Sequence, residues 1–368
     1  MRVLLVSERF WPHLGGVEIG SLQLLERLRD RGYEFEVVTS AEKGEPELDA
    51  FQGMAVHRLP VHAALAEGAP ERIGANRARL RGIKRRFAPH VVHVNQVGLC
   101  AMLNHETAAA HPAPTLVTLR TLFTAEAFQP NTALRKIVAS AAWVNSCAVA
   151  GLRPALAAVP DLVTRSSVIF NGLDWPTFEA SRLPFDPPRL LCIGRLVAEK
   201  GFDLAIAALP TLLRRFPAVR LSIAGDGPAR LMLERQVVEL GLADRVEFLG
   251  WVSPPAVHAL MDKASMVVIP SRSEVLPLVA IQAAQMARPL VGTAVGGLPE
   301  LVAHGETGIL VPANDSQALG DAIATLLDQP SLAERMGQAS QTRARALFSL
   351  DGSVNAYDAL YHRLVTPR

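Results

Sequence analysis

The stretch WPTFEASRLPFDPPRLLCIGRLVAEKG, Trp175 to Gly201, divides the chain into two similar halves. Its first part, residues 175–189, contains four prolines and no regular hydrophobic period. Because proline lacks a backbone donor and restricts the residue before it, we expect a linker at 177–189. Its second part is an apolar strand, RLLCIGR, and a glycine-bracketed loop that leads into a helix. A strand and a helix that begin after a linker indicate a second domain.

Strand and helix patterns alternate on both sides of this stretch. Before it, RVLLVS, a helical segment that ends at Gly32 and YEFEVVTS follow one another, and later strands are predicted at HVVHVNQ, TLVTLR, 141–147 and 166–172. After it, VRLSIAGDG, VEFLGWV, MVVIPS and PLVGTAV alternate with helices, and helices at 331–347 and 351–365 close the chain. Repeated strand–helix–strand order indicates parallel sheets. We therefore expect an α/β fold with two Rossmann-like parallel-sheet domains, 1–176 and 190–347, facing across a cleft.

Composition limits the classes of protein that this chain can be. The 368 residues are 49% hydrophobic and 20% charged, which suits two domains with large cores. A net charge of +2 gives no indication of a nucleic-acid partner. Cys100, Cys147 and Cys192 lie far apart in apolar surroundings without metal-ligand spacing, which favours reduced thiols. With no signal-peptide pattern and no apolar run of about 18 residues, we expect a cytoplasmic protein.

The loops that follow strands are the places to look for chemistry, because open parallel sheets bind ligands at the carboxyl ends of their strands. Gly15 and Gly16 lie between the first strand and a helix, where backbone amides suit an anion, although a plain tight turn explains them equally well. Arg195 and Lys200 flank the loop GRLVAEKG, Gly194 to Gly201, and two cations beside a helix start suit a diphosphate. The alternative for them is a pair of solvated surface charges.

Two further loops in the second half carry candidate ligands. AGDGP contains Gly225, Asp226 and Gly227, which form either a structural turn or a nucleotide contact. In SRSEVLPLVAIQ, Glu274 can accept hydrogen bonds from sugar hydroxyls, or it can cap the following helix. Gln282, eight residues later, can bind a diol but lacks the charge-assisted acceptor, a difference of about 1 kcal/mol per hydrogen bond. Its alternative is an ordinary helix surface residue.

Eight segments in order resemble the retaining glycosyltransferases of family 4, which have the GT-B fold, over nearly the whole chain. They are PHLGGVE, PHVVHVN, NGLD, GRLVAEKG, AGDGP, FLGWVS, PSRSEVLPLV and GGLPELV. The resemblance implies transfer of a hexose from a nucleotide-diphosphate sugar, UDP- or GDP-linked, to a glycan or lipid-linked acceptor, with retention of anomeric configuration. It implies no metal and no other cofactor, and a role in cell-envelope polysaccharide synthesis. It also implies that residues 348–368 form a C-terminal helix that crosses back to the first domain.

The resemblance also assigns roles to individual residues. Arg195 and Lys200 would bind the diphosphate, and Glu274 would bind hydroxyls of the donor sugar. Together with Arg120 these three form the implied catalytic group. The implied donor site consists of Gly15, Gly16, Gly194, Arg195, Lys200, Gly225, Asp226, Gly227, Glu274, Leu278, Val279 and Gln282.

Two positions depart from the family pattern. The family commonly has a His where TLRT places Arg120, and a ribose-binding Glu where this chain has Gln282. Arginine cannot act as a base near neutral pH, but it can hold a sugar hydroxyl or a phosphate. These departures favour a second hypothesis, a nucleotide-sugar-binding accessory subunit with little transfer activity. An epimerase matches different loop motifs, and the absence of Gly-x-Gly-x-x-Gly after the first strand disfavours a dinucleotide oxidoreductase.

A basic segment in the first half suggests a surface function. Residues 71–87 contain seven basic residues and one acid, and Arg77, Arg81, Lys84 and Arg85 recur at helical spacing on one face. Relatives often meet anionic membranes with a basic first-domain surface, so we expect a peripheral contact with the inner membrane face through 72–86. The alternative is a solvated helix face. His93, at a strand end, either faces the cleft or is a satisfied residue of the core.

Overall fold

The computed structural model describes residues 1–12 and 15–366, which form two compact units. Unit 1 comprises residues 1–171 and the chain from Leu350 onward, and unit 2 comprises Gly172–Ser349. The Pro-rich segment 177–189, expected as a linker, lies within unit 2. It is fastened there because Arg288 donates to the carbonyl of Ser181 at 2.8 Å and Ser265 donates to the carbonyl of Pro184.

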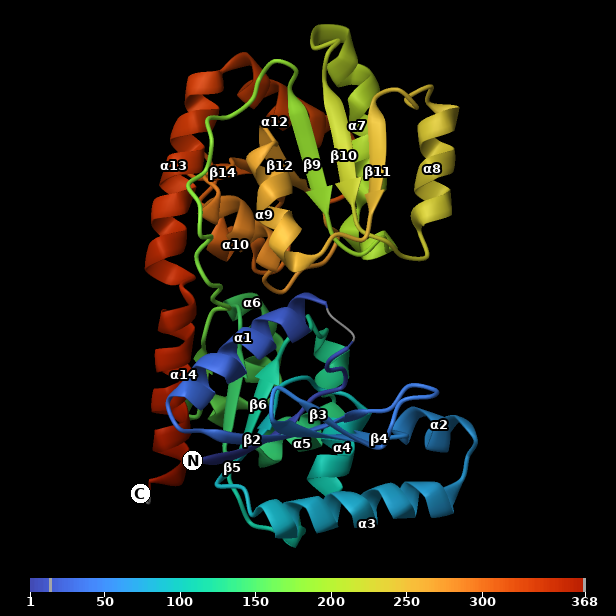
Figure 1. The fold of residues 1–368 in the computed structure, drawn as a ribbon, viewed down its shortest axis with the longest axis vertical. Helices are drawn as coiled ribbons and strands as arrows, with labels where there is room; N and C mark the ends of the chain where they lie inside the picture. Colours follow the sequence, from blue (N-terminus) through green and yellow to red (C-terminus); the bar gives the residue numbers. More distant parts are fainter. Residues whose placement is uncertain (13–14, 367–368) are drawn as a thin grey trace. The chain divides into compact units, whose positions relative to one another are not determined.

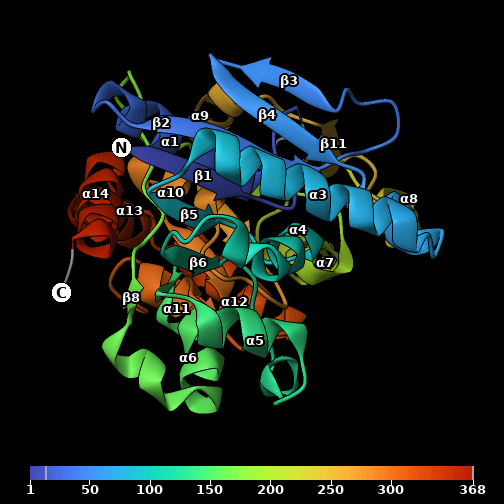
Figure 2. The same cartoon turned by 90° about the horizontal axis from the view of Figure 1, so that it is seen from below.

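Unit 1 contains an eight-stranded sheet in the order β3-β4-β2-β1-β5-β6-β7-β8 (Figures 1 and 2). Its strands are β1 (Arg2–Val6), β2 (Glu34–Ser40), β3 (Leu48–Phe51), β4 (Met54–Leu59), β5 (Val91–Val94), β6 (Thr115–Leu119), β7 (Trp143–Ser146) and β8 (Ser166–Val168). Its helices are α1 (Gly16–Asp30), α2 (Val61–Ala66), α3 (Pro70–Phe87), α4 (Leu99–Glu106), α5 (Ala133–Ser140), α6 (Val149–Ala158) and α14 (Leu350–Val365). The strands pair in parallel, except that β3 pairs with β4 in an antiparallel hairpin.

Unit 2 contains a six-stranded sheet, parallel at every described pairing, in the order β11-β10-β9-β12-β13-β14. Its strands are β9 (Arg189–Ile193), β10 (Arg220–Ala224), β11 (Val246–Gly250), β12 (Met266–Ile269), β13 (Leu290–Thr293) and β14 (Gly308–Val311). Its helices are α7 (Phe202–Arg215), α8 (Arg230–Glu239), α9 (Pro254–Asp262), α10 (Leu278–Gln285), α11 (Leu298–Leu301), α12 (Ser316–Asp328) and α13 (Pro330–Leu347). The predicted α/β class with two parallel-sheet units is therefore confirmed. A cleft between the units stays a prediction.

Each sheet has one point at which the order of its strands reverses. In unit 1 the chain continues from β1 to β2 on one side and later returns to place β5 on the other. In unit 2 the same happens between β9 and β12. Loops diverge at such a point and leave a crevice at the carboxyl ends of the strands, where ligands of doubly wound sheets bind. The fold therefore directs attention to the loops after β1, β5, β9 and β12.

The last helix, α14, packs into the core of unit 1, as predicted. Val354 and Tyr357 are buried in one cluster with Val3 and Leu5 of β1. The same helix determines the role of His93. The Nδ1 atom of that imidazole lies 2.7 Å from the Tyr361 hydroxyl.

On its other side, His93 Nε2 lies 2.8 Å from Thr118 Oγ1. Burial, with a smaller contribution from the charge of Arg120, lowers the pKa of His93 to about 3. His93 is thus a neutral, satisfied core residue, and the expectation that it could face a cleft is wrong.

Three further points concern the cysteines, membrane-spanning helices and the edge of the unit 1 sheet. Cys100, Cys147 and Cys192 are buried thiols outside any disulfide, as expected. No described helix is both long and apolar enough to cross a bilayer. The β3–β4 hairpin was not foreseen, because β3 is a four-residue edge strand whose side chains are at most partly buried, so it carries little hydrophobic signal.

The basic face expected on α3 is largely neutralised. Arg77 forms an ion pair with Glu106, and Arg72, Arg79 and Arg86 also pair with carboxylates. Lys84 was expected on this exposed basic face, whether the face contacts a membrane or only water, but it is only 1% exposed, so that expectation is wrong. Its Nζ donates to the Asn104 carbonyl at 3.0 Å and to Thr107 Oγ1 at 3.2 Å, near the C-terminal end of α4. Among the described residues, only Arg81 and Arg85 of this set are exposed without a side-chain partner.

Lys84 should make the stability of the protein depend on pH. Burial lowers its pKa from 10.5 to about 8 in the folded state. Between these values the unfolded chain binds one more proton than the folded chain, so stability rises with pH there. We expect the free energy of unfolding, measured with urea, to rise by about 2 kcal/mol more between about pH 7.5 and 9.5 in the wild type than in Lys84→Met. The exposed-site variant Arg81→Met should follow the wild type, whereas parallel curves for wild type and Lys84→Met would contradict the buried charge.

Candidate functional site

Lys200 and Glu274 meet at the reversal point of the unit 2 sheet. Lys200 ends a short 3₁₀ turn in the loop after β9, and Glu274 lies in the loop after β12. Lys200 Nζ donates to Glu274 Oε1 at 2.6 Å. The side chain of Glu274 is 8% exposed and that of Lys200 is 28% exposed. The structure thus brings two predicted ligand residues into direct contact at the position where the topology predicts a ligand.

Glu274 is held by its own loop and does not cap the next helix. The Ser271 hydroxyl, which is 1% exposed, donates to Glu274 Oε1 at 2.7 Å. Helix α10 begins after Pro277 and has no side-chain cap. The helix-cap alternative for Glu274 is therefore wrong, and its carboxylate is oriented by Ser271 and Lys200.

Arg272 fastens the β12 loop to the β9 loop, a role that sequence reasoning missed. Its guanidinium donates to both carboxylate oxygens of Asp203, in the first turn of α7, at 2.8 and 2.6 Å. It also donates to the Ala198 carbonyl at 2.7 Å, and its own backbone N–H donates to the Glu199 carbonyl at 2.7 Å. This bidentate pair fixes the backbone on which Lys200 stands. Arg272 and Asp203 lie 69 residues apart, so no local pattern could reveal the contact.

Glycines in the predicted motifs allow backbone segments to touch. A Cβ atom on Gly201 would lie 2.0 Å from the Pro270 carbonyl oxygen, and one on Gly225 would lie 1.8 Å from the Gly194 carbonyl oxygen. The β9 and β10 loops therefore pack backbone to backbone, and Gly194 N–H donates to the Ala224 carbonyl at 3.0 Å. The structural-turn interpretation accounts for Gly225 and Gly227. A nucleotide contact by this loop stays a prediction.

The other predicted residues of unit 2 make few contacts. Arg195 is exposed, and within the described part of the chain its side chain has no hydrogen-bond or ion-pair partner. Gln282 is half-buried on α10, and its amide likewise has no partner among described residues.

Leu278 and Val279 are partly exposed in the first turn of α10. Asp226 is exposed and accepts from the Gly227 N–H at 2.7 Å. In residues 1–12 and 15–366, no group of three or more His, Cys, Asp or Glu side chains is placed to hold a metal ion.

In unit 1 the predicted glycine loop already has a carboxylate partner. Gly16 is the first residue of α1, and the Gly15 N–H donates to Glu18 Oε2 at 2.9 Å. Glu18 is 7% exposed. A phosphate can take this amide only if Glu18 moves, which sequence reasoning did not anticipate. Residues 13–14 of PHLGG lie outside the described residues.

Arg120 follows β6 and is held by asparagines on both sides. Its Nε donates to the backbone carbonyl of Asn95 at 3.1 Å and to the side-chain Oδ1 of Asn95 at 2.9 Å. Its Nη1 donates to Asn171 Oδ1 at 2.8 Å. Asn95 follows β5, so Arg120 lies at the carboxyl edge of the sheet, one strand from the reversal point.

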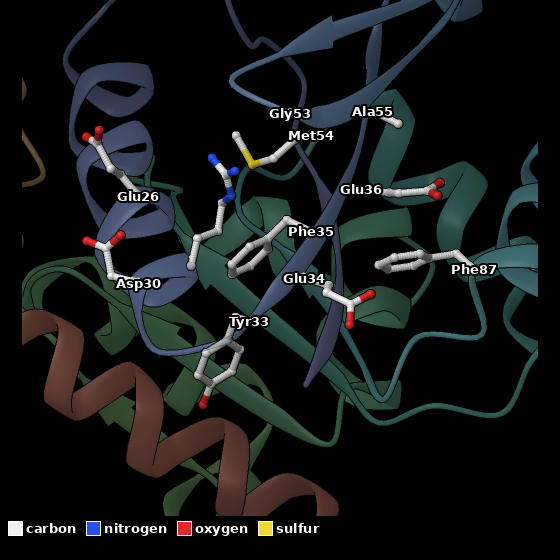
Figure 3. Close-up of a pocket in the computed structure, with 11 residues that line it drawn as sticks. Glu26, Asp30, Tyr33, Glu34, Phe35, Glu36, Gly53, Met54, Ala55 and Phe87 are labelled. Carbon is white, nitrogen blue, oxygen red and sulfur yellow. The ribbon is translucent and has the colours of Figure 1, made fainter.

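A cavity of about 590 Å³ lies elsewhere in unit 1 (Figure 3). The end of α1 and the beginnings of β2 and β4 line it, with Glu26, Asp30, Glu34 and Glu36 among the lining residues. It opens at the amino ends of the parallel strands, opposite to the edge that carries Arg120. It is therefore separate from the candidate site.

Gly201 provides a test of the loop packing. Gly201 and Gly241 both have a left-handed backbone, with φ of 65° and 66°, but only a Cβ on Gly201 meets another atom within 4 Å. We expect Gly241→Ala to lower the free energy of unfolding by about 1–2 kcal/mol through backbone strain alone. Gly201→Ala should lower it further, because the Pro270 carbonyl must move. Equal losses in denaturant unfolding would show that the loops are not packed in this way.

Two family models cover most of the chain. "Glycosyltransferase Family 4" matches residues 14–174, and "Glycosyl transferases group 1" matches residues 174–343. The two matches meet within a few residues of the boundary between the units, at 171–172.

Relatives and solved structures agree with these matches. The chain is 37% identical to an alpha-D-kanosaminyltransferase of Streptomyces kanamyceticus over 49% of this chain, but that match spans only 46% of the relative. It is 30% identical to a D-inositol 3-phosphate glycosyltransferase of Mycolicibacterium paratuberculosis, over 95% of this chain and 86% of the relative. A sucrose-phosphate synthase structure from Thermosynechococcus elongatus shares the fold with a TM-score of 0.83, at 24% identity, over 99% of this chain and 98% of that one.

Anabaena HepE, solved in complex with UDP-glucose, has a TM-score of 0.81 at 22% identity, over 99% of this chain and 100% of that one. The matches of both family models, together with the inositol-phosphate relative, show that the chain belongs to the glycosyltransferases of family 4, with the two parallel-sheet units of the GT-B fold.

Proposed function

We propose that the chain transfers a hexose from a UDP- or GDP-linked sugar to a glycan or lipid-linked acceptor, with retention of anomeric configuration. The observation that carries the proposal is the Lys200–Glu274 contact at the reversal point of the unit 2 sheet. Names of relatives support it: one acts on D-inositol 3-phosphate, and another, 37% identical over 42% of this chain, is a GDP-mannose-dependent mannosyltransferase. The HepE structure supports a UDP-sugar as the alternative donor.

In the proposed reaction, Lys200 and Glu274 separate when the donor binds. The ammonium of Lys200, together with the exposed guanidinium of Arg195, binds the diphosphate and stabilises the negative charge that develops as it leaves. The carboxylate of Glu274, still oriented by Ser271, accepts hydrogen bonds from hydroxyls of the sugar. An ion pair formed before the donor arrives holds both side chains in place.

Retention follows if the acceptor hydroxyl attacks from the face that the diphosphate leaves. The bond from C1 to the diphosphate oxygen breaks, the bond from C1 to the acceptor oxygen forms, and the acceptor proton passes to the departing diphosphate. Charge stabilisation by Lys200 and Arg195 requires no metal ion in this scheme, so we expect turnover to survive a chelator. Comparing the anomeric configuration of donor and product by NMR tests this proposal, and an inverted product would reject it.

The second candidate function is an accessory subunit that binds a nucleotide sugar with little turnover. Arg120 and Gln282 favour it, because both replace the residue common in the family. A chain that binds the donor but produces no transfer or hydrolysis, also after Gln282→Glu combined with Arg120→His, would favour this candidate over the transferase.

We further propose a cytoplasmic location with a peripheral membrane contact and a role in cell-envelope polysaccharide synthesis. With Lys84 buried and four arginines of α3 paired, the contact would depend on Arg81 and Arg85. Each basic residue near an anionic surface contributes about 1 kcal/mol, so these two alone give a weak contact. Sedimentation with anionic vesicles at low and high salt tests it.

Lys200→Ala should weaken nucleotide binding strongly. A hydrogen bond to a charged group contributes about 1.5–3 kcal/mol, which corresponds to a 10- to 150-fold loss of affinity. Calorimetry with UDP, GDP, ADP and their sugar conjugates identifies the donor and measures the loss. Lys263→Ala, at an exposed lysine of the same unit, is the matched control and should bind like the wild type. Unchanged affinity in Lys200→Ala would show that the diphosphate is held elsewhere.

Gln282→Glu should strengthen the contact with the ribose of the nucleotide. Replacing an amide by a carboxylate gains about 1 kcal/mol per hydrogen bond, so we expect about fivefold tighter binding. The gain should vanish with a nucleotide whose ribose hydroxyls are removed. An equal gain with and without these hydroxyls would mean that Gln282 does not contact the ribose.

A further inference from the structure

The positive charge of Arg120 has no counter-charge among the described residues. Its three hydrogen bonds go to a backbone carbonyl and to two side-chain amides, from Asn95 and Asn171. All three acceptors are neutral, and no carboxylate within 4 Å of this guanidinium is recorded in the described part of the chain. A half-buried cation held only by neutral groups attracts an anion from outside the protein.

Three other arginines of low or intermediate exposure are compensated by carboxylates. Arg58 and Arg288, each 1% exposed, form ion pairs with Asp49 and Asp262, and the half-buried Arg272 pairs with Asp203.

Two half-buried arginines, Arg2 and Arg343, bond carbonyls at helix C-terminal ends, which carry partial negative charge. Arg2 donates to the Ala88 carbonyl at the end of α3, and Arg343 donates to the Leu301 carbonyl at the end of α11. The Asn95 carbonyl follows a strand and offers no such field.

The guanidinium is held in a fixed orientation. Asn95 is 2% exposed, and its own amide donates to Ser21 Oγ at 2.8 Å, while Ser21 Oγ donates to the Val17 carbonyl at 2.6 Å. This chain of bonds fixes the acceptor for Nε, and Asn171 fixes Nη1. The remaining amino group, Nη2, has no partner within residues 1–12 and 15–366. Arg120 is thus oriented by the protein with one donor group left for a ligand.

The groups around Arg120 do not neutralise its positive charge. The residue follows β6 at the carboxyl edge of the sheet, beside β5 and close to the reversal point. Its recorded neighbours His93 and Tyr361 are neutral near pH 7, because burial lowers the pKa of the first and raises that of the second. A neutral sugar hydroxyl would leave the charge uncompensated, whereas an oxyanion would compensate it and accept the free donor.

We propose that Arg120 is the oxyanion-binding residue of unit 1 and holds a phosphate or carboxylate group of a substrate. The inference deepens the proposed function and depends on it for the source of the oxyanion. That source is either the diphosphate of the donor or an anionic group on the acceptor. Both sources offer the same oxyanion chemistry. They differ in whether Arg120 contributes to the affinity for the donor or to the affinity for the acceptor.

The test uses the full chain and three variants. Arg120→Gln removes the charge, and Arg120→Lys keeps the charge but loses the planar fork. Arg77→Gln, at a partly exposed arginine of the same unit paired with Glu106, is the control. Calorimetry measures the affinity for UDP and GDP, and then the affinity for inorganic phosphate with the nucleotide that binds present at saturation. Thermal unfolding checks that each variant is folded. If Arg120→Gln does not fold, the affinities of Arg120→Lys are compared with those of the wild type instead.

Two results support the proposal, and they identify the source. Phosphate binding that falls at least tenfold in Arg120→Gln and less in Arg120→Lys, with unchanged nucleotide affinity, assigns the oxyanion to the acceptor. Nucleotide affinity that falls at least tenfold in Arg120→Gln assigns it to the donor. Arg77→Gln should match the wild type in both cases.

The proposal is overturned if both affinities in the Arg120 variants stay within twofold of the wild type, or if phosphate fails to bind and nucleotide affinity is unchanged. Failure of the proposed function looks different. In that case no nucleotide binds to the wild type or to any variant. The phosphate affinities of the nucleotide-free wild type and Arg120→Gln then show whether Arg120 binds an oxyanion.

Discussion

The parallel pairing of β9 with β12 is the constraint on which the candidate site depends. Only two residue pairs define its register, Met266 with Leu190 and Val267 with Leu191. Because parallel strands end at the same edge, this pairing sets the loops after the two strands side by side. Lys200 and Glu274, 74 residues apart in sequence, meet there at 2.6 Å. Arg272 and Gly201 then hold the two loops together, one through the Asp203 carboxylate and the other by leaving room for the Pro270 carbonyl.

Charge balance distinguishes the two units. In unit 2 the candidate cation and anion, Lys200 and Glu274, form an ion pair, so a ligand that binds either side chain would replace one partner of an existing pair. In unit 1 the carboxylate of Glu18 accepts from the Gly15 N–H at the start of α1, while the partners of Arg120 within the described residues are all neutral. In the described part of unit 1, a helix start whose first amide is already bonded therefore accompanies a guanidinium without a counter-charge. This combination suits a chain that receives one anionic group on unit 1 by side-chain charge instead of by a helix terminus.

The fold could be predicted to a large extent, and the site to a smaller extent. Alternation of apolar strands and periodic helices predicted two parallel-sheet units, because burial on both sheet faces imposes long apolar runs on the strands. The boundary was harder to predict. The Pro-rich stretch has the composition of a linker, but bonds from Arg288 and Ser265 attach it to unit 2. The basic face of α3 was misjudged for the same reason, since Lys84 is buried against the end of α4, a contact between residues 20 apart or more.

The sequence by itself determined the order of the elements, the loops in which Lys200, Glu274 and Arg120 stand, and the resemblance to family 4, because these depend on local pattern and motif order. Only the tertiary structure decided which of these residues meet and which charges are compensated. Ser271 and Lys200 orient Glu274, Asn95 and Asn171 hold Arg120, and Tyr361 makes His93 part of the core. The reason is physical: electrostatic interactions and burial depend on distances between residues far apart in the chain, and those distances exist only once the sheets have formed.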